Sequence, residues 1–189
     1  TAEALEHMQG FLGSRTPHQI VTINPEYIII ARNDPEFREV LAAADLALAD
    51  GVGLIWAARF LGRPLAARLP GADLAERLAD LAAREGYRIY LLGGQEGVAA
   101  QAAQALGQRY PGLIVAGTYS GSPGEEEEAD IVARIKQAAP QMLFVAYGAP
   151  QQDMWIRRNL AHLNVPLAMG IGGALDYLSG SVPRAPLWM

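Results

Sequence analysis

The fold is decided by Tyr87-Arg-Ile-Tyr-Leu-Leu92, an apolar strand pattern, and by the residues that follow it. The strand runs into the glycine turn Gly93-Gly-Gln-Glu-Gly97, and the Ala- and Gln-rich stretch Val98–Tyr110 then predicts a helix. A second apolar stretch, Leu113-Ile-Val-Ala-Gly117, predicts another strand. This order is a βαβ unit, which joins two parallel strands by a right-handed crossover.

Strand and helix patterns alternate on both sides of this unit. Further strands are expected at His18–Thr22, Leu46–Ala49, Gln141–Ala146 and Val165–Met169, and helical patterns separate them. The apolar run that begins at Leu46 reads as a buried strand. The alternation predicts an α/β fold, with a mostly parallel Rossmann-like sheet and helices on both faces. With 189 residues, we expect one domain over residues 1–189.

Composition excludes several classes of function. The chain is 51% hydrophobic and 19% charged, which is typical of a folded protein with a sizeable core, and its net charge of -5 gives no indication of nucleic-acid binding. It has no Cys, so thiolate metal sites and cysteine nucleophiles are excluded. Its three histidines, His7, His18 and His162, are too far apart in sequence to form a metal-ligand pair.

Polar side chains follow several of the predicted strands. Thr22 and Asn24 follow the first strand, Asp50 the second, and the amides of Gln151 and Gln152 the fifth. The carboxyl ends of parallel strands meet at one edge of a sheet, where α/β proteins bind ligands. A structural interpretation also stays open, in which Asp50 caps the next helix or forms an Asx-turn and Asn24 or Thr22 caps its own helix.

Two more features could belong to the same edge. Arg68 precedes a Pro-Gly turn and is either a solvated surface arginine or a ligand for phosphate or carboxylate. Gly93 and Gly94 form a turn that could admit a phosphate, but the three-glycine dinucleotide fingerprint is incomplete. NAD binding is therefore only an alternative interpretation.

The available groups favour transfer from a nucleotide-activated donor. The sequence shows no Ser-His-Asp pattern, no P-loop lysine and no carboxylate pair of the kind glycoside hydrolases use. One acid, Asp50, beside a phosphate-binding edge could deprotonate an acceptor hydroxyl while a diphosphate leaves.

Several motifs together resemble the WecG/TagA/CpsF family of bacterial glycosyltransferases. They are Thr22-Ile-Asn-Pro-Glu26, Ala49-Asp-Gly-Val-Gly53, Arg68-Leu-Pro-Gly-Ala-Asp73, Gly148-Ala-Pro-Gln-Gln-Asp-Met-Trp155, Gly170-Ile-Gly-Gly173 with Asp176, and Arg184-Ala-Pro186. The resemblance covers nearly the whole chain, in the family's order and spacing, and is strongest to members that transfer N-acetylmannosamine in wall teichoic acid synthesis.

The resemblance implies a reaction and a set of site residues. The family moves a sugar from a UDP donor to an undecaprenyl-diphosphate-linked sugar at the cytoplasmic face of the membrane, with inversion and without a metal. It implies that Asp50 is the catalytic base. The implied substrate-binding residues are Thr22, Asn24, Arg68, Gln152 and Asp176, and Gly93 and Gly94 are expected near the nucleotide.

Family members also have an additional first strand and a basic C-terminal appendage that closes the site and contacts the membrane. Since the chain runs from Thr1 to Met189 without them, we expect a core that binds UDP weakly, turns over poorly and self-associates. Two other readings stay open: a nucleotide- or NAD-binding module without transferase activity, and a scaffold that docks a membrane partner.

Overall fold

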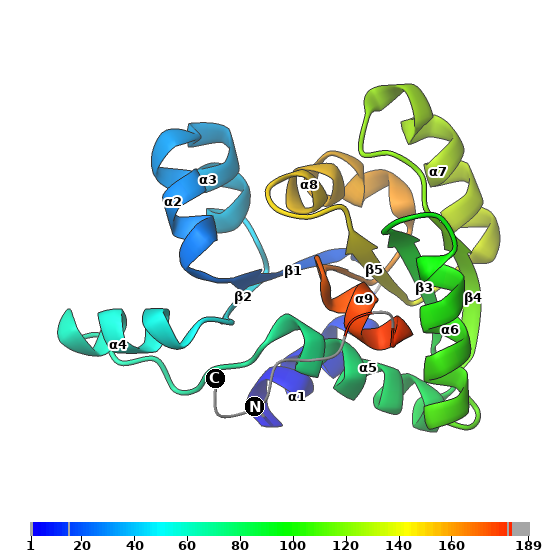
Figure 1. The fold of residues 1–189 in the computed structure, drawn as a ribbon, viewed down its shortest axis with the longest axis horizontal. Helices are drawn as coiled ribbons and strands as arrows, with labels where there is room; N and C mark the ends of the chain where they lie inside the picture. Colours follow the sequence, from blue (N-terminus) through cyan, green and yellow to red (C-terminus); the bar gives the residue numbers. More distant parts are fainter. Residues whose placement is uncertain (1, 15, 181, 183–189) are drawn as a thin grey trace.

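The computed structural model describes residues 2–14, 16–180 and 182, in which strands and helices alternate (Figure 1). The strands are β1 (His18–Ile23), β2 (Leu46–Ala49), β3 (Arg88–Gly93), β4 (Ile114–Tyr119), β5 (Met142–Ala146) and β6 (Leu167–Gly170). The helices are α1 (Ala2–Leu12), α2 (Pro25–Asn33), α3 (Pro35–Ala42), α4 (Val52–Phe60), α5 (Gly71–Glu85), α6 (Val98–Arg109), α7 (Glu125–Ala138), α8 (Gln151–Leu163) and α9 (Ala174–Ser179). Every predicted strand is present. The Arg184–Pro186 motif lies outside the described residues.

All six strands pair in parallel in one sheet, in the order β2-β1-β6-β5-β3-β4. The predicted α/β class is therefore confirmed. The first two strands in sequence, β1 and β2, lie at one side of the sheet, and the next two, β3 and β4, lie at the other. The last two, β5 and β6, lie between these pairs. Parallel strands need crossover connections, and helices supply them here.

Alternation along each strand divides the core between the two faces of the sheet. In β3, Ile89 and Leu91 join a cluster formed with α1, α5, α6 and α9, whereas Tyr90 and Leu92 join a cluster formed with α7 and α8. Figure 1 shows these helix groups on opposite sides of the sheet. Full burial of a large apolar side chain such as Phe144 stabilises the fold by about 1.5–3 kcal/mol.

The prediction that the strand beginning at Leu46 is buried was wrong. β2 lies at the margin of the sheet and, among the described residues, pairs only with β1, so Ala47 is exposed and Leu48 is half-buried. A short apolar run predicts a strand, but it does not say whether the strand has neighbours on both sides.

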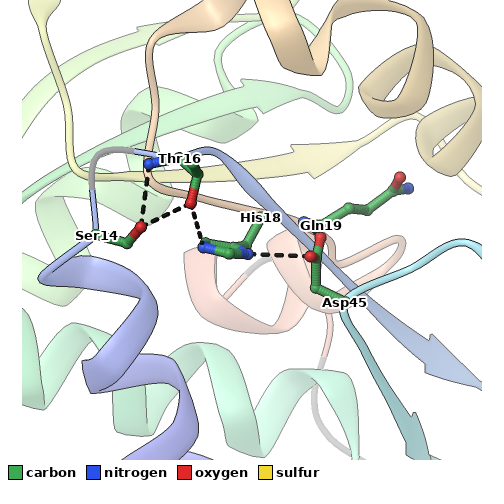
Figure 2. A network of polar contacts seen from close by, with 5 residues as sticks. All are labelled: Ser14, Thr16, His18, Gln19 and Asp45. Atoms are coloured by element: carbon green, nitrogen blue, oxygen red, sulfur yellow. Dashed lines mark hydrogen bonds and ion pairs between the residues drawn. The ribbon is translucent and has the colours of Figure 1, made fainter.

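A polar network fixes the amino ends of β1 and β2 (Figure 2). Asp45 accepts a hydrogen bond from the Gln19 N–H at 2.9 Å, and its other oxygen lies 3.0 Å from His18 Nδ1. On the far side of the ring, His18 Nε2 lies 3.0 Å from Thr16 Oγ1, which contacts Ser14 Oγ at 2.6 Å. Because the amino ends lie opposite the carboxyl edge, this network stabilises the strand pair and not the candidate site.

Candidate functional site

A cavity of about 610 Å³ lies at the carboxyl edge of the sheet. Its walls come from the ends of β1 and β2, the segment that opens α5, the turn before α8, and the segment between β6 and α9. Five of the six predicted catalytic and substrate-binding residues line it: Thr22, Asn24, Asp50, Arg68 and Gln152. The predicted convergence of strand ends is therefore present for β1, β2 and β5, and the end of β6 joins them.

Asp50 is held at the end of β2 by backbone groups from two other segments. Its N–H donates to the Ile23 carbonyl at 2.8 Å, which extends the β1–β2 pairing by one residue. Its Oδ2 accepts a hydrogen bond from the Gly71 N–H at 3.2 Å. Gly51, not Asp50, is the N-cap residue of α4, so the capping interpretation of Asp50 was wrong for that helix.

Arg68 also contacts Asp50, but through the backbone. Its Nε donates to the Asp50 carbonyl oxygen at 2.7 Å, and the side chain is exposed at the cavity. The N-terminus of the 15-residue helix α5 follows, with Gly71 and Ala72 in the cavity wall. A guanidinium beside a helix N-terminus favours anions, because the N–H groups and the helix dipole add to its positive charge.

Thr22 and Asn24 line the cavity from β1 and its exit. Thr22 is buried, and its Oγ1 lies close to Gly71, where an added Cβ would be 3.0 Å away. The Asn24 side chain accepts a hydrogen bond from the Tyr27 N–H at 3.1 Å and caps α2, with Pro25 in its first turn. Asn24 therefore caps its helix, as the structural interpretation predicted, and it also lines the cavity.

Gln152 lies at the floor of the cavity and is only 3% exposed. Its Nε2 donates to the Tyr27 hydroxyl at 2.8 Å, and its Oε1 accepts from the Gly172 N–H at 2.9 Å. Both ends of the amide are thus engaged, and Gln152 connects α2 to the glycine turn after β6. This contact orients the turn that forms one cavity wall.

The residue after Gln152 in α8 has a buried carboxylate that the sequence analysis did not include in the site. Asp153 is fully buried; its Oδ2 accepts a 2.7 Å hydrogen bond from the Tyr27 hydroxyl, and its carbonyl accepts one from Gln19 Nε2 at 3.0 Å. Burial raises the pKa of Asp153 to about 6, although the hydrogen bond from Tyr27 opposes that shift. Burial and the nearby Asp153 raise the pKa of Tyr27.

The sequence contains only a weak indication of the hydrogen bonds that join Tyr27, Gln152 and Asp153. Asp153 follows Gln152 directly, but Tyr27 lies 126 residues earlier and reads as an ordinary core residue of an amphipathic helix. Only the fold brings the two together.

Gly93, Gly94 and Asp176 are not brought into the cavity wall. Gly93 has φ 99° and passes so close to β5 that a Cβ would lie 2.7 Å from the Ala146 backbone. The Gly94 N–H donates to the Ala146 carbonyl at 3.0 Å. Tight packing of β3 against β5 thus accounts for Gly93. Gly94 has φ 76°, and an added Cβ would lie 2.9 Å from Leu175 Cδ2 of α9, so packing accounts for this glycine too. The nucleotide role of both glycines stays a prediction. Asp176 is half-buried in α9, and its neighbour Tyr177 lines the cavity instead.

The described residues contain no group of three or more His, Cys, Asp or Glu side chains that could hold a metal ion. The metal-independent reaction stays a prediction from the family resemblance.

Comparison with models of known protein families shows which family this chain belongs to. A model of the glycosyl transferase WecG/TagA/CpsF family matches residues 1–189, the whole chain. The chain belongs to this family.

Two curated relatives agree with that assignment. The chain is 34% identical over 167 residues to a Bacillus spizizenii protein and 32% identical over 186 residues to a Staphylococcus aureus protein. Both relatives are named N-acetylglucosaminyldiphosphoundecaprenol N-acetyl-beta-D-mannosaminyltransferase. The match to the Bacillus protein covers 88% of this chain and 64% of that protein, which is less than two thirds of its length. The match to the Staphylococcus protein covers 97% of this chain and 72% of that protein.

Proposed function

We propose that this protein is an inverting glycosyltransferase. In the proposed reaction it transfers N-acetylmannosamine from a UDP donor to N-acetylglucosamine linked to undecaprenyl diphosphate, in teichoic acid or surface polysaccharide synthesis. The observation that carries the proposal is one carboxylate, Asp50, placed beside an anion-favouring helix end in a cavity of a glycosyltransferase-family chain. The names of the two relatives supply the sugar and the acceptor.

In the proposed mechanism Asp50 is the general base. It takes the proton of the acceptor hydroxyl as that oxygen bonds to the anomeric carbon and the bond to the diphosphate breaks. The hydrogen bond from the Gly71 N–H to Oδ2 holds the carboxylate at the cavity, where the acceptor hydroxyl is proposed to bind. The incoming oxygen attacks from the face opposite the diphosphate, which inverts the anomeric carbon.

The leaving diphosphate carries the negative charge that develops in this step. Arg68 uses Nε on the Asp50 carbonyl, and its terminal nitrogens carry further N–H donors for a phosphate oxygen. The first turn of α5 adds the positive end of a helix dipole. In the proposal Thr22 and Asn24 bind the sugars, and Gln152 positions the Gly172 turn against the donor.

The proposed reaction needs no metal, since Arg68 and α5 would neutralise the diphosphate. It takes place at the inner face of the cytoplasmic membrane, where the protein would be peripheral. Within the described residues, no helix has the length and apolar character required to cross a bilayer. Neither the family match nor the relatives favour an NAD-binding module without activity.

The test is turnover by the protein. UDP-sugars are screened with a short-chain polyprenyl-diphosphate-linked N-acetylglucosamine as acceptor, and release of UDP is measured with and without a chelator. We expect UDP-N-acetylmannosamine to be the preferred donor and the chelator to have no effect.

The Asp50→Asn variant tests the base. Asparagine keeps an oxygen for the Gly71 N–H, so UDP affinity should stay near that of the wild type while turnover falls by about 10²–10⁴-fold. Asp130→Asn, which removes an exposed carboxylate paired with Arg134 on α7, is the matched control and should keep full turnover. Wild-type turnover in Asp50→Asn would remove Asp50 from this role.

A further inference from the structure

The helix that directly follows Asp50 is apolar and unburied. None of the nine residues of α4 is buried, and Trp56 and Phe60 are 71% and 91% exposed. Figure 1 shows α4 extending away from the sheet and the other helices. A helix with apolar residues on a solvent-exposed surface marks an interaction site, because helices that pack in the core bury such residues.

The large side chains of α4 form a continuous ridge. Val52, Trp56 and Phe60 are spaced four residues apart, so they lie on one side of the helix, and we call them the α4 ridge. Leu61, 73% exposed, and Leu65, 46% exposed, follow in the loop after the helix. The apolar surface therefore continues beyond the helix end.

The charge of this segment is opposite to that of the whole chain. Residues 51–72 contain Arg59, Arg63 and Arg68 and no Asp or Glu, although the protein has a net charge of -5. Neither Arg59 nor Arg63 forms an ion pair with another described residue. Exposed apolar side chains with arginines and no acids are typical of helices that lie in the headgroup region of anionic membranes.

We propose that α4 and the loop after it dock on an anionic lipid surface. The α4 ridge enters the interface between headgroups and acyl chains, where tryptophan is favoured. Arg59 and Arg63 contact lipid phosphates. Since α4 begins two residues after Asp50, this contact places the cavity at the membrane surface.

The lipid contact of α4 would add a membrane-binding surface to the proposed function. It rests partly on that function, because the proposed acceptor is linked to a lipid. It is separable by experiment, because lipid binding is measured without turnover. Vesicle binding without transferase activity would support the lipid contact and contradict the proposed reaction. Transferase activity without vesicle binding would support the reaction and contradict the lipid contact.

The experiment measures binding of the full chain to vesicles of phosphatidylcholine with and without phosphatidylglycerol. We expect binding only to the anionic vesicles, and a loss of about tenfold or more in Trp56→Ser/Phe60→Ser and in Arg59→Gln/Arg63→Gln. Ile114→Ser, an exposed apolar residue on β4, is the matched control for the ridge and should bind as the wild type does. Circular dichroism of each variant verifies the fold. If Trp56→Ser/Phe60→Ser unfolds, Arg59→Gln/Arg63→Gln still tests the lipid contact.

A local readout separates this contact from any other lipid contact of the chain. The chain has a third tryptophan, so the measurement is made in a Trp188→Phe background. There, bromine-labelled lipids should quench part of the tryptophan fluorescence, and Trp56→Phe should abolish that part while keeping vesicle binding. Trp155 is fully buried and gives a constant background. Equal quenching in wild type and Trp56→Phe would overturn the proposal. So would a dimer that dissociates in Trp56→Ser/Phe60→Ser without any vesicle binding, because the surface would then join two copies of the chain.

Discussion

Asp153→Asn should change how the stability of the protein depends on pH. The carboxyl of Asp153 is fully buried, and its pKa rises from the ordinary 3.8 to about 6, chiefly because burial disfavours its charge. Asparagine has nearly the same shape, keeps an oxygen for the Tyr27 hydroxyl and cannot titrate. The variant therefore removes the charge and preserves the packing.

The sign and size of the effect follow from linkage. A raised pKa in the folded state means that the folded protein holds the proton more tightly than the unfolded chain does. The contribution of Asp153 is therefore fully present below pH 3.8 and is lost as the pH rises through about 6. The rise in the pKa of Asp153 from 3.8 to about 6 corresponds to roughly 3 kcal/mol of unfolding free energy between acidic and neutral conditions.

The assay is urea denaturation followed by tryptophan fluorescence at several pH values from about 4 to about 7.5. The quantity of interest is the difference in unfolding free energy between wild type and Asp153→Asn, because titration of all other groups cancels in it. As the pH rises, Asp153→Asn should gain about 3 kcal/mol relative to the wild type, or roughly 6–12 °C in melting temperature.

Parallel stability curves for wild type and Asp153→Asn would refute this reasoning. They would mean that the hydrogen bond from Tyr27 compensates completely for the desolvation of the Asp153 charge.

Two further predictions concern the residues around Gln152. An alanine Cβ at Gly170 would lie 2.6 Å from Gln152 Nε2, so Gly170→Ala should destabilise the fold by about 1–3 kcal/mol in the same urea assay. Gly107→Ala, in α6 with no atom within 4 Å of the added Cβ, should instead stabilise it by about 0.5–1 kcal/mol, and equal effects at the two sites would contradict the packing argument. Asn24→Ala should cost about 0.5–2 kcal/mol by removing the cap on the Tyr27 N–H, whereas Asn24→Ser should restore most of it; a thermal melt distinguishes the two.

The fold was largely predictable because its signals are local. Apolar runs bounded by Gly and Pro indicated all the strands, and strand–helix alternation indicated a parallel sheet. The strand order was not predictable, since crossover helices can place the next parallel strand on either side of the sheet. The edge position of β2 and the partial exposure of Leu48 follow from that order.

The same limit applies to the site. Strand-end reasoning correctly brought Asp50, Thr22 and Gln152 together, because β2, β1 and β5 lie within a few strands of one another. It overextended to Gly93, since β3 lies four strands from β2, the strand that Asp50 follows, or about 19 Å at the usual spacing. The partnership of Tyr27 with Asp153 needs the packing of α2 against α8, which no local pattern encodes.

The marginal position of β2 gives the two walls of the cavity different resistance to opening. Asp50 follows a strand held by one neighbour, whereas Gly172 follows β6, which is held on both sides. Local unfolding requires least free energy where backbone pairing is sparse, so amide hydrogens of β2 should exchange with solvent sooner than those of β6. A substrate that contacts both walls would therefore slow exchange mainly in β2, and its binding would stabilise an edge strand of the sheet.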